Sequence, residues 1–234
     1  MLRDVQPELL DSLPENAAQA VRSRADLRRL NFIMGHSGIL SQALQRNHDA
    51  PPVRSRPLRV VELGAGDGTM LLHMARRCSA LGVSARVTLL DRQDLVSTET
   101  RNAFAALDWP VECMVTDVFA WLEESAPPVD VIFANLFLHH FPDQSLAVLL
   151  ERAAARTNRF IACEPRRSAH ALAASRMLWL MGCNSVTRHD APVSVRAGFS
   201  GRDLSSLWPQ DPAWRTSEQA AGCFSHCFIA KRHG

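Results

Sequence analysis

The chain has 234 residues, of which 47% are hydrophobic, so it can form one domain with a buried core. Its 26 basic and 24 acidic side chains leave a net charge of +2, and the arginines are scattered along the chain. This balance argues against a nucleic acid or an anionic membrane as the main partner. The start MLRDVQPELLD carries charges where a signal peptide would be apolar, and no apolar run approaches the ~20 residues of a membrane span. We therefore expect a cytoplasmic protein.

Six dispersed cysteines indicate free thiols in a reducing compartment. Cys223, His226 and Cys227 lie close together in the sequence, but the run CFSHCFIAKR is typical of a strand, whose alternate residues point to opposite faces. The spacing therefore disfavours a zinc site, and we expect no metal ion.

The first third of the chain divides into two regions. Residues 7–44 carry apolar side chains at helical spacing, and we predict a helical lid over 1–46. A linker rich in proline and charge follows at 47–57, and a single larger domain is expected over 58–234.

Beyond the linker, short apolar runs alternate with amphipathic segments. We predict strands at 58–63, 86–90, 111–115, 129–134 and 159–163, and helices at 68–81, 94–107, 143–156 and 168–181. Continuous apolar strands separated by helices indicate a parallel sheet covered on both faces. Two last strands, 214–219 and 223–231, are too close in sequence for a crossover helix and must pair antiparallel. The predicted fold class is α/β, a doubly wound, Rossmann-like sheet of seven strands that ends in an antiparallel hairpin.

The run VVELGAGDGTMLLHMA places Gly64, Gly66 and Gly68 between a buried strand and a helix. Glycines allow a sharp turn and a close approach of ligand to backbone, and the helix N-terminus offers free N–H groups. We interpret the run as a ligand-binding loop, the alternative being a plain tight turn. Its spacing differs from the dinucleotide fingerprint G-x-G-x-x-G. Glu62 would bind an ammonium group and repel a pyrophosphate, so an NAD-dependent oxidoreductase is the less favoured alternative.

Two further carboxylates follow the next two predicted strands. Asp91 ends RVTLLD, where an acid accepts hydrogen bonds from both ribose hydroxyls in doubly wound folds. Asp117 would either reach an adenine amino group or cap the next helix. Acids at three successive strand ends favour a single nucleoside-containing cofactor.

These motifs resemble those of class I S-adenosylmethionine-dependent methyltransferases, and the resemblance covers 58–234. It implies S-adenosylmethionine as the cofactor, with Glu62 and the loop 64–68 on the methionine moiety, Asp91 on the ribose and Asp117 on the adenine. Asn135 would lie beside the reacting sulfonium. The remaining cofactor contacts that it implies are Ala65, Arg92 and Val118.

The segment DVIFANLFLHHFPD also resembles this family, and it places His139 and His140 one turn beyond the fourth strand. With no tyrosine in the chain, either histidine is a candidate general base, because its ordinary pKa of about 6.5 lies near working pH. The alternative is that they pack against or cap the next helix. Glu164, at the end of the fifth strand, would hold that imidazole in one tautomer, or would instead pair with Arg166 or Arg167.

A narrower resemblance is to small bacterial methyltransferases of secondary metabolism that act on phenolic or polyketide products. It implies transfer to a hydroxyl of an apolar or aromatic small molecule, with substrate contacts expected at His36, His189 and Arg196. Methylation of nitrogen or carbon and a non-catalytic partner subunit of the same fold remain alternatives. We expect no nucleic-acid partner, and a monomer or homodimer.

Overall fold

The computed structural model describes residues 1–46, 56–125 and 127–233. Most of the predicted linker, 47–55, lies outside the described residues. Among the helices that are described, none combines the length and the apolar character needed to cross a membrane.

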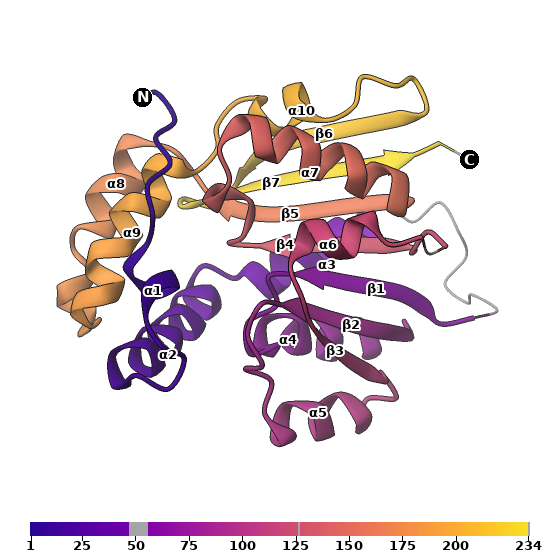
Figure 1. Ribbon diagram of the computed structural model, residues 1–234, viewed down its shortest axis with the longest axis horizontal. Helices are drawn as coiled ribbons and strands as arrows, with labels where there is room; N and C mark the ends of the chain where they lie inside the picture. The colour runs from indigo at the N-terminus through magenta and orange to yellow at the C-terminus, as the bar shows by residue number, and fades with distance from the viewer. Residues whose placement is uncertain (47–55, 126, 234) are drawn as a thin grey trace.

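A seven-stranded sheet with strand order β3-β2-β1-β4-β5-β7-β6 forms the centre of the molecule (Figure 1). Strands β1 to β5 pair in parallel, and β7 runs antiparallel to both β5 and β6. The predicted doubly wound sheet with its terminal hairpin is thus confirmed. The strand bounds are β1 Leu58–Leu63, β2 Ala85–Asp91, β3 Val111–Val115, β4 Val131–Asn135, β5 Arg159–Pro165, β6 Trp214–Ala221 and β7 Ser225–Arg232.

Helices cover both faces of this sheet because its central strands are apolar on both sides. Val60 packs into one buried cluster and the next residue, Val61, into another on the opposite face. The first cluster also holds apolar residues of α3 (His36–Arg46), α4 (Thr69–Ser79) and α5 (Thr98–Ala105). The second holds apolar residues of α6 (Val118–Glu123), α7 (Asp143–Arg156) and α10 (Asp203–Leu207).

A separate group of helices lies beyond the carboxyl ends of β4 and β5 (Figure 1). It consists of α1 (Leu9–Ser12), α2 (Ala18–Ile33), η1 (Leu138–His140), α8 (Ala169–Ser175), η2 (Leu178–Met181) and α9 (Ser185–Ala197). Polar contacts join α2 to α9: Asp26 accepts a hydrogen bond from the Asn184 N–H at 2.8 Å, and the Ser23 and Thr187 hydroxyls are 2.8 Å apart. Ligands of open α/β sheets bind at this end of the strands, so these helices form the walls of a site.

Two local expectations differ from the structure, and one helix was not predicted. The single helix expected at 168–181 is wrong, because the chain leaves α8 after Ser175 and η2 buries only Leu178. The stretch 184–199, which carried no secondary-structure prediction, contains α9, whose N-cap Asn184 accepts from the Thr187 N–H at 2.8 Å. Helix α3 lies inside the predicted lid, yet its Leu40 and Leu44 are fully buried against the sheet. Only α1 and α2 therefore remain as candidate lid helices.

Candidate active site

The glycine loop between β1 and α4 needs its glycines for two different reasons. Gly64, Gly66 and Gly68 all have positive φ, at 64°, 55° and 73°, which strains any residue with a Cβ. At Gly64 a Cβ would also lie 2.2 Å from the Phe137 ring, and at Gly68 it would lie 2.6 Å from Leu89 Cδ1. Gly66 faces open space, so its backbone is accessible to a ligand.

A cavity of about 130 Å³ lies beside this loop, and we call it the loop cavity. Helix α2 covers it, and the Arg28 guanidinium on α2 bonds the Asp67 carboxylate of the loop at 2.7 Å. The cavity is lined by Arg24, Leu27, Arg28, Asn31, Glu62, Gly64, Ala65, Gly66, Asp67, Thr69, Met70, Asn135 and Leu136.

Two buried polar atoms in the loop cavity lack a hydrogen-bond partner among the described residues: Glu62 Oε2 and Asn135 Oδ1. Burial, together with the charges of Asp67 and Asp91, raises the pKa of Glu62 well above its ordinary value. Such a carboxyl group is costly unless a cation or a donor reaches it. The residues present therefore fit a ligand that carries a positive charge and hydrogen-bond donors, as the ammonium of S-adenosylmethionine does.

The other predicted cofactor residues lie outside the lining of this cavity. Asp91 accepts hydrogen bonds from the N–H groups of Gly66 at 2.8 Å and Gln93 at 3.0 Å. Asp117 caps α6 by accepting from the Phe119 N–H at 2.8 Å, which is the alternative that the sequence left open. Val118 is buried and Arg92 is exposed. Their contacts with ribose and adenine stay predictions.

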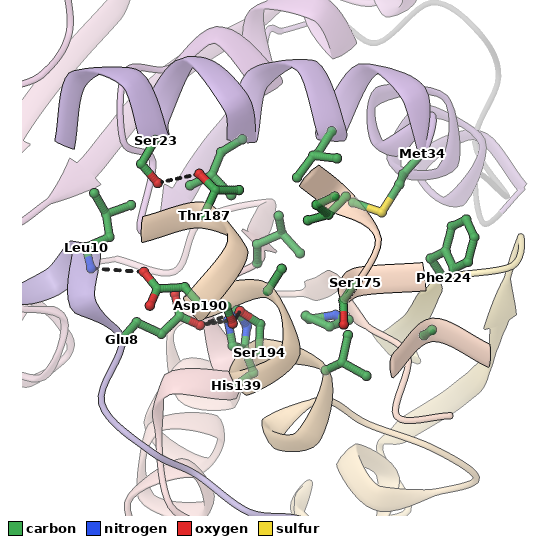
Figure 2. Close-up of a pocket in the computed structure, with 18 of the residues that line it drawn as sticks. Glu8, Leu10, Ser23, Met34, His139, Ser175, Thr187, Asp190, Ser194 and Phe224 are labelled. Atoms are coloured by element: carbon green, nitrogen blue, oxygen red, sulfur yellow. Dashed lines mark hydrogen bonds and ion pairs between the residues drawn. The ribbon is translucent and has the colours of Figure 1, made fainter. Parts of the chain in front are cut away.

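Figure 2 shows a second, apolar cavity, whose volume is about 300 Å³. It adjoins the loop cavity, since Leu27 and Leu136 line both. Leu136 has φ of 51°, a conformation that residues other than glycine rarely adopt and that concentrates at functional sites. Most of the wall of the apolar cavity comes from α2, α8, η2 and α9. Its apolar lining comprises Leu10, Leu27, Leu30, Ile33, Met34, Leu136, Pro165, Ala171, Ala174, Leu178, Met181, Ala191, Val195 and Phe224.

Buried against this apolar lining is a histidine that is bound to a carboxylate. His139 Nδ1 lies 2.8 Å from Glu164 Oε2, as the adjacency of β4 and β5 predicted. Glu164 Oε1 accepts from the N–H groups of Phe137 at 3.0 Å and Leu138 at 2.9 Å, so the same side chain shapes η1. Glu164 is thus held by His139 and by the backbone of η1, and Arg167, one of the two alternative partners, bonds Asp203 at 2.6 Å.

The other nitrogen of His139 meets a residue that the sequence analysis did not single out. Glu8 Oε1, just before α1, lies 3.3 Å from His139 Nε2 and also accepts from the Ser194 hydroxyl (Figure 2). Burial alone would lower the pKa of His139, but Glu164 and Glu8 together raise it to about 9. Burial alone would raise the pKa of Glu8, and His139 lowers it to about 2. No motif marks Glu8 in the sequence, because it lies 131 positions before His139.

His140 is less enclosed than His139. Its ring lies 4.2 Å from the His139 ring, and its Nδ1 is 3.3 Å from the Asp11 carboxylate. Glu8, His139 and His140 each place one possible ligand atom within 4.8 Å of the others, a spacing that a metal ion could accept. The ion pairs already described account for their proximity.

The three residues predicted to contact the substrate, His36, His189 and Arg196, do not line the same site. His36 is buried, lines the apolar cavity and places Nε2 2.8 Å from the Ser225 hydroxyl. Burial lowers its pKa to about 4, so it is neutral near pH 7. His189 is about half exposed and bonds its neighbour Asp190, and neither it nor Arg196 lines either cavity. The geometry thus keeps His36 as a candidate contact and brings His189 and Arg196 to neither cavity.

Cys223, His226 and Cys227, near the C-terminus, differ in their burial. Among the described residues no cysteine forms a disulfide, and Cys223 is exposed while Cys227 is buried. His226 Nε2 bonds the Glu218 carboxylate at 2.7 Å on the neighbouring strand β6. His226 is therefore held by a partner other than these two thiols.

Residues 60–176, half of the chain, match the family model described as a methyltransferase domain. The chain belongs to the class I S-adenosylmethionine-dependent methyltransferases. No curated protein matches its sequence.

Solved structures with this fold include methyltransferases of different lengths. The plantazolicin methyltransferase, in complex with a desmethyl analogue and S-adenosylhomocysteine, is 11% identical, with a TM-score of 0.64 over 95% of this chain and 92% of its own. An O-methyltransferase family protein from Burkholderia thailandensis is 17% identical, with a TM-score of 0.60 over 92% of this chain and 60% of its own. Mitomycin 7-O-methyltransferase is 16% identical, with a TM-score of 0.61 over 96% of this chain and 60% of its own. The 234-residue chain thus spans about three fifths of the length of the Burkholderia thailandensis protein and of mitomycin 7-O-methyltransferase.

Proposed function

We propose that this methyltransferase transfers the methyl group of S-adenosylmethionine to a hydroxyl of an apolar, most simply aromatic, small molecule. The observation that carries this proposal is the junction of the two cavities at Leu27 and Leu136, with motif residues on one side and the His139–Glu164 pair on the other. A cofactor and an acceptor bound in them would meet at this junction.

In the proposed reaction Glu62 and the glycine loop hold the cofactor, which supplies a methyl group on a positively charged sulfur. Asn135, at the end of β4, lies beside the junction and helps to orient the reacting groups. The apolar wall binds the acceptor and excludes water, which matters because much of methyl transfer depends on alignment.

His139 is the proposed base for the acceptor hydroxyl. A phenol or alcohol gains from losing its proton as the new bond forms, and Nε2 of His139 is the nitrogen that faces away from Glu164. Glu164 fixes the tautomer through Nδ1 and stabilises the imidazolium that results.

Names of solved neighbours agree with a hydroxyl acceptor, since two of them are O-methyltransferases. Helices α1 and α2 are the proposed lid, because residues of both segments line the apolar cavity and α2 also covers the loop cavity. Closure of such a lid keeps water from the reacting atoms.

The test is a panel of phenols, polyketides and amines incubated with S-adenosylmethionine and analysed by product mass. The matched control is Glu62→Gln, which keeps the side-chain shape and removes the negative charge. Methylated phenols or alcohols from the wild type, with much less product from the control, would support the proposal. Methylation of amines alone, or no product despite measurable cofactor binding, would overturn it.

A further inference from the structure

The N-terminal segment, residues 1–13, contacts η1 and α9 mainly through polar groups, with little apolar burial. Arg3 donates to the carbonyls of Ala197 at 2.8 Å and Phe141 at 2.9 Å and lies 4.6 Å from the centre of the Phe199 ring. Asp190 accepts from the N–H groups of Leu9 at 2.8 Å and Leu10 at 3.0 Å. Helix α1 itself buries no residue. These contacts bring one acidic side chain, Glu8, to the wall of the apolar cavity.

Glu8 occupies the nitrogen of His139 that the proposed chemistry needs. Nδ1 is already committed to Glu164 at 2.8 Å, and Nε2 lies 3.3 Å from Glu8 Oε1. A histidine that donates through both nitrogens carries both protons and has no lone pair with which to accept another. Two carboxylates at its nitrogens thus favour the cationic form of His139, which cannot act as a base.

We propose that Glu8 is a positioning residue that keeps His139 protonated until an acceptor hydroxyl displaces the Glu8 carboxylate from Nε2. This inference rests on the proposed function, since it presupposes that His139 is the base. As Glu8 withdraws, before the proposed lid closes over the acceptor, the Nε2 proton passes to solvent and leaves a lone pair. That lone pair then accepts the proton of the acceptor hydroxyl.

Of the charged groups around His139, Glu8 is the one whose position we expect to decide whether Nε2 carries a proton. Glu164 on β5 is fixed by the N–H groups of η1 and is part of the base itself. The His140 ring lies 4.2 Å from the His139 ring in a tilted geometry, and Arg3 donates to the His139 carbonyl at 3.4 Å, so neither occupies an imidazole nitrogen of His139. Asp190 on α9 lines the same cavity but bonds the backbone of α1. Asp11 faces His140.

Displacement of Glu8 is chemically reasonable for the acceptor class that we propose. The Ser194 hydroxyl bonds Glu8 and lines the cavity, so it offers a hydrogen bond to whichever oxygen replaces the carboxylate. An acceptor hydroxyl can make the same two contacts, with Nε2 and with Ser194, without carrying a charge into the apolar cavity. An acceptor without a hydroxyl at this place would leave Glu8 where it is.

The first experiment measures the pKa of His139 by NMR of the imidazole in full-length, cofactor-bound protein. Glu8→Gln keeps the side-chain shape and should lower that pKa from about 9 by at least about one unit. Asp4→Asn is the matched control, because Asp4 is an exposed acid of the same segment whose carboxylate bonds Gln6. It should leave the pKa unchanged. Ser194→Ala, which weakens the hold on Glu8, should lower the pKa by a smaller amount.

The second experiment follows kcat/KM against pH with an acceptor found in the panel. For the wild type, kcat/KM should rise with pH up to about 9. For Glu8→Gln the rise should come earlier, with kcat/KM at pH 7 about tenfold or more above the wild type. An unshifted His139 pKa, an unshifted pH profile, or loss of turnover by Glu8→Gln at every pH would each overturn the role of Glu8. The proposal that His139 is the base has a separate test, and near-normal turnover by His139→Ala would overturn it.

Discussion

The carboxylate of Asp91, at the end of β2, accepts a hydrogen bond at 2.8 Å from the backbone N–H of Gly66, in the loop after β1. The acid predicted to bind ribose therefore also holds the loop predicted to bind methionine. Asp91→Ala should weaken S-adenosylhomocysteine binding at least tenfold, because it removes hydrogen bonds worth roughly 1.5–3 kcal/mol each and releases the loop. Calorimetry on the folded variant checks this, and an unchanged dissociation constant would refute the assignment.

Cofactor binding should be linked to the loss of a proton from Glu62. Burial raises the pKa of Glu62 and so favours its protonated form in the free protein, whereas a bound ammonium would favour the ionised form. Affinity should consequently increase with pH until Glu62 is ionised in the free protein. Titration of the cofactor product in buffers of different ionisation enthalpy measures the proton count. Glu62→Gln is the control, and equal proton release by that variant would contradict the role of Glu62.

Replacement of the two adjacent histidines should have unequal effects on turnover. His139→Ala should lower the turnover rate about 10²–10⁴-fold, the range expected for loss of a general base. His140→Ala should cost less, since His140 has Asp11 and not Glu164 as its carboxylate partner. Glu164→Gln should also cost less than His139→Ala, and cofactor affinity should barely change in any of the three. Near-normal turnover by both histidine variants would indicate catalysis by alignment alone.

The ion pair between Glu8 and His139 should make stability depend on pH in two windows. The raised pKa of His139 means that its contribution is fully present below its ordinary pKa of 6.5 and is lost as pH rises through about 9. The lowered pKa of Glu8 means that its contribution is present above 4.5 and is lost as pH falls toward about 2. The difference in unfolding free energy between wild type and Glu8→Gln should thus be largest between about pH 4.5 and 6.5. A difference that does not vary with pH would contradict this.

Truncations should separate the proposed lid from the core. Deletion of residues 1–46 should prevent folding, because it removes α3 and exposes the surface that Leu40 and Leu44 cover. Deletion of 1–13 should leave a folded protein that still binds the cofactor product. Leu44→Ala alone should cost about 2–5 kcal/mol of stability, measured by denaturant unfolding. A soluble, folded 47–234 fragment would show that α3 is dispensable.

Local sequence patterns were enough to predict much of the fold. The strand at 58–63 and the helix at 143–156 lie where hydrophobic periodicity places them, because each buries an apolar face against a sheet. The antiparallel end of the sheet followed from a link too short for a crossover helix. The glycine loop was equally clear from the spacing of its glycines, whose positive φ angles would strain any residue with a Cβ.

What the sequence determined by itself is therefore the sheet, the loop and the cofactor class, all of which depend on residues close together along the chain. The tertiary structure alone decided the charge state of His139, because that depends on Glu8 and Glu164, which approach its two nitrogens from distant segments. It also decided that His36 lines the apolar cavity while His189 does not, and that α3 belongs to the core. Burial and long-range pairing set these properties, and neither leaves a periodic trace in the sequence.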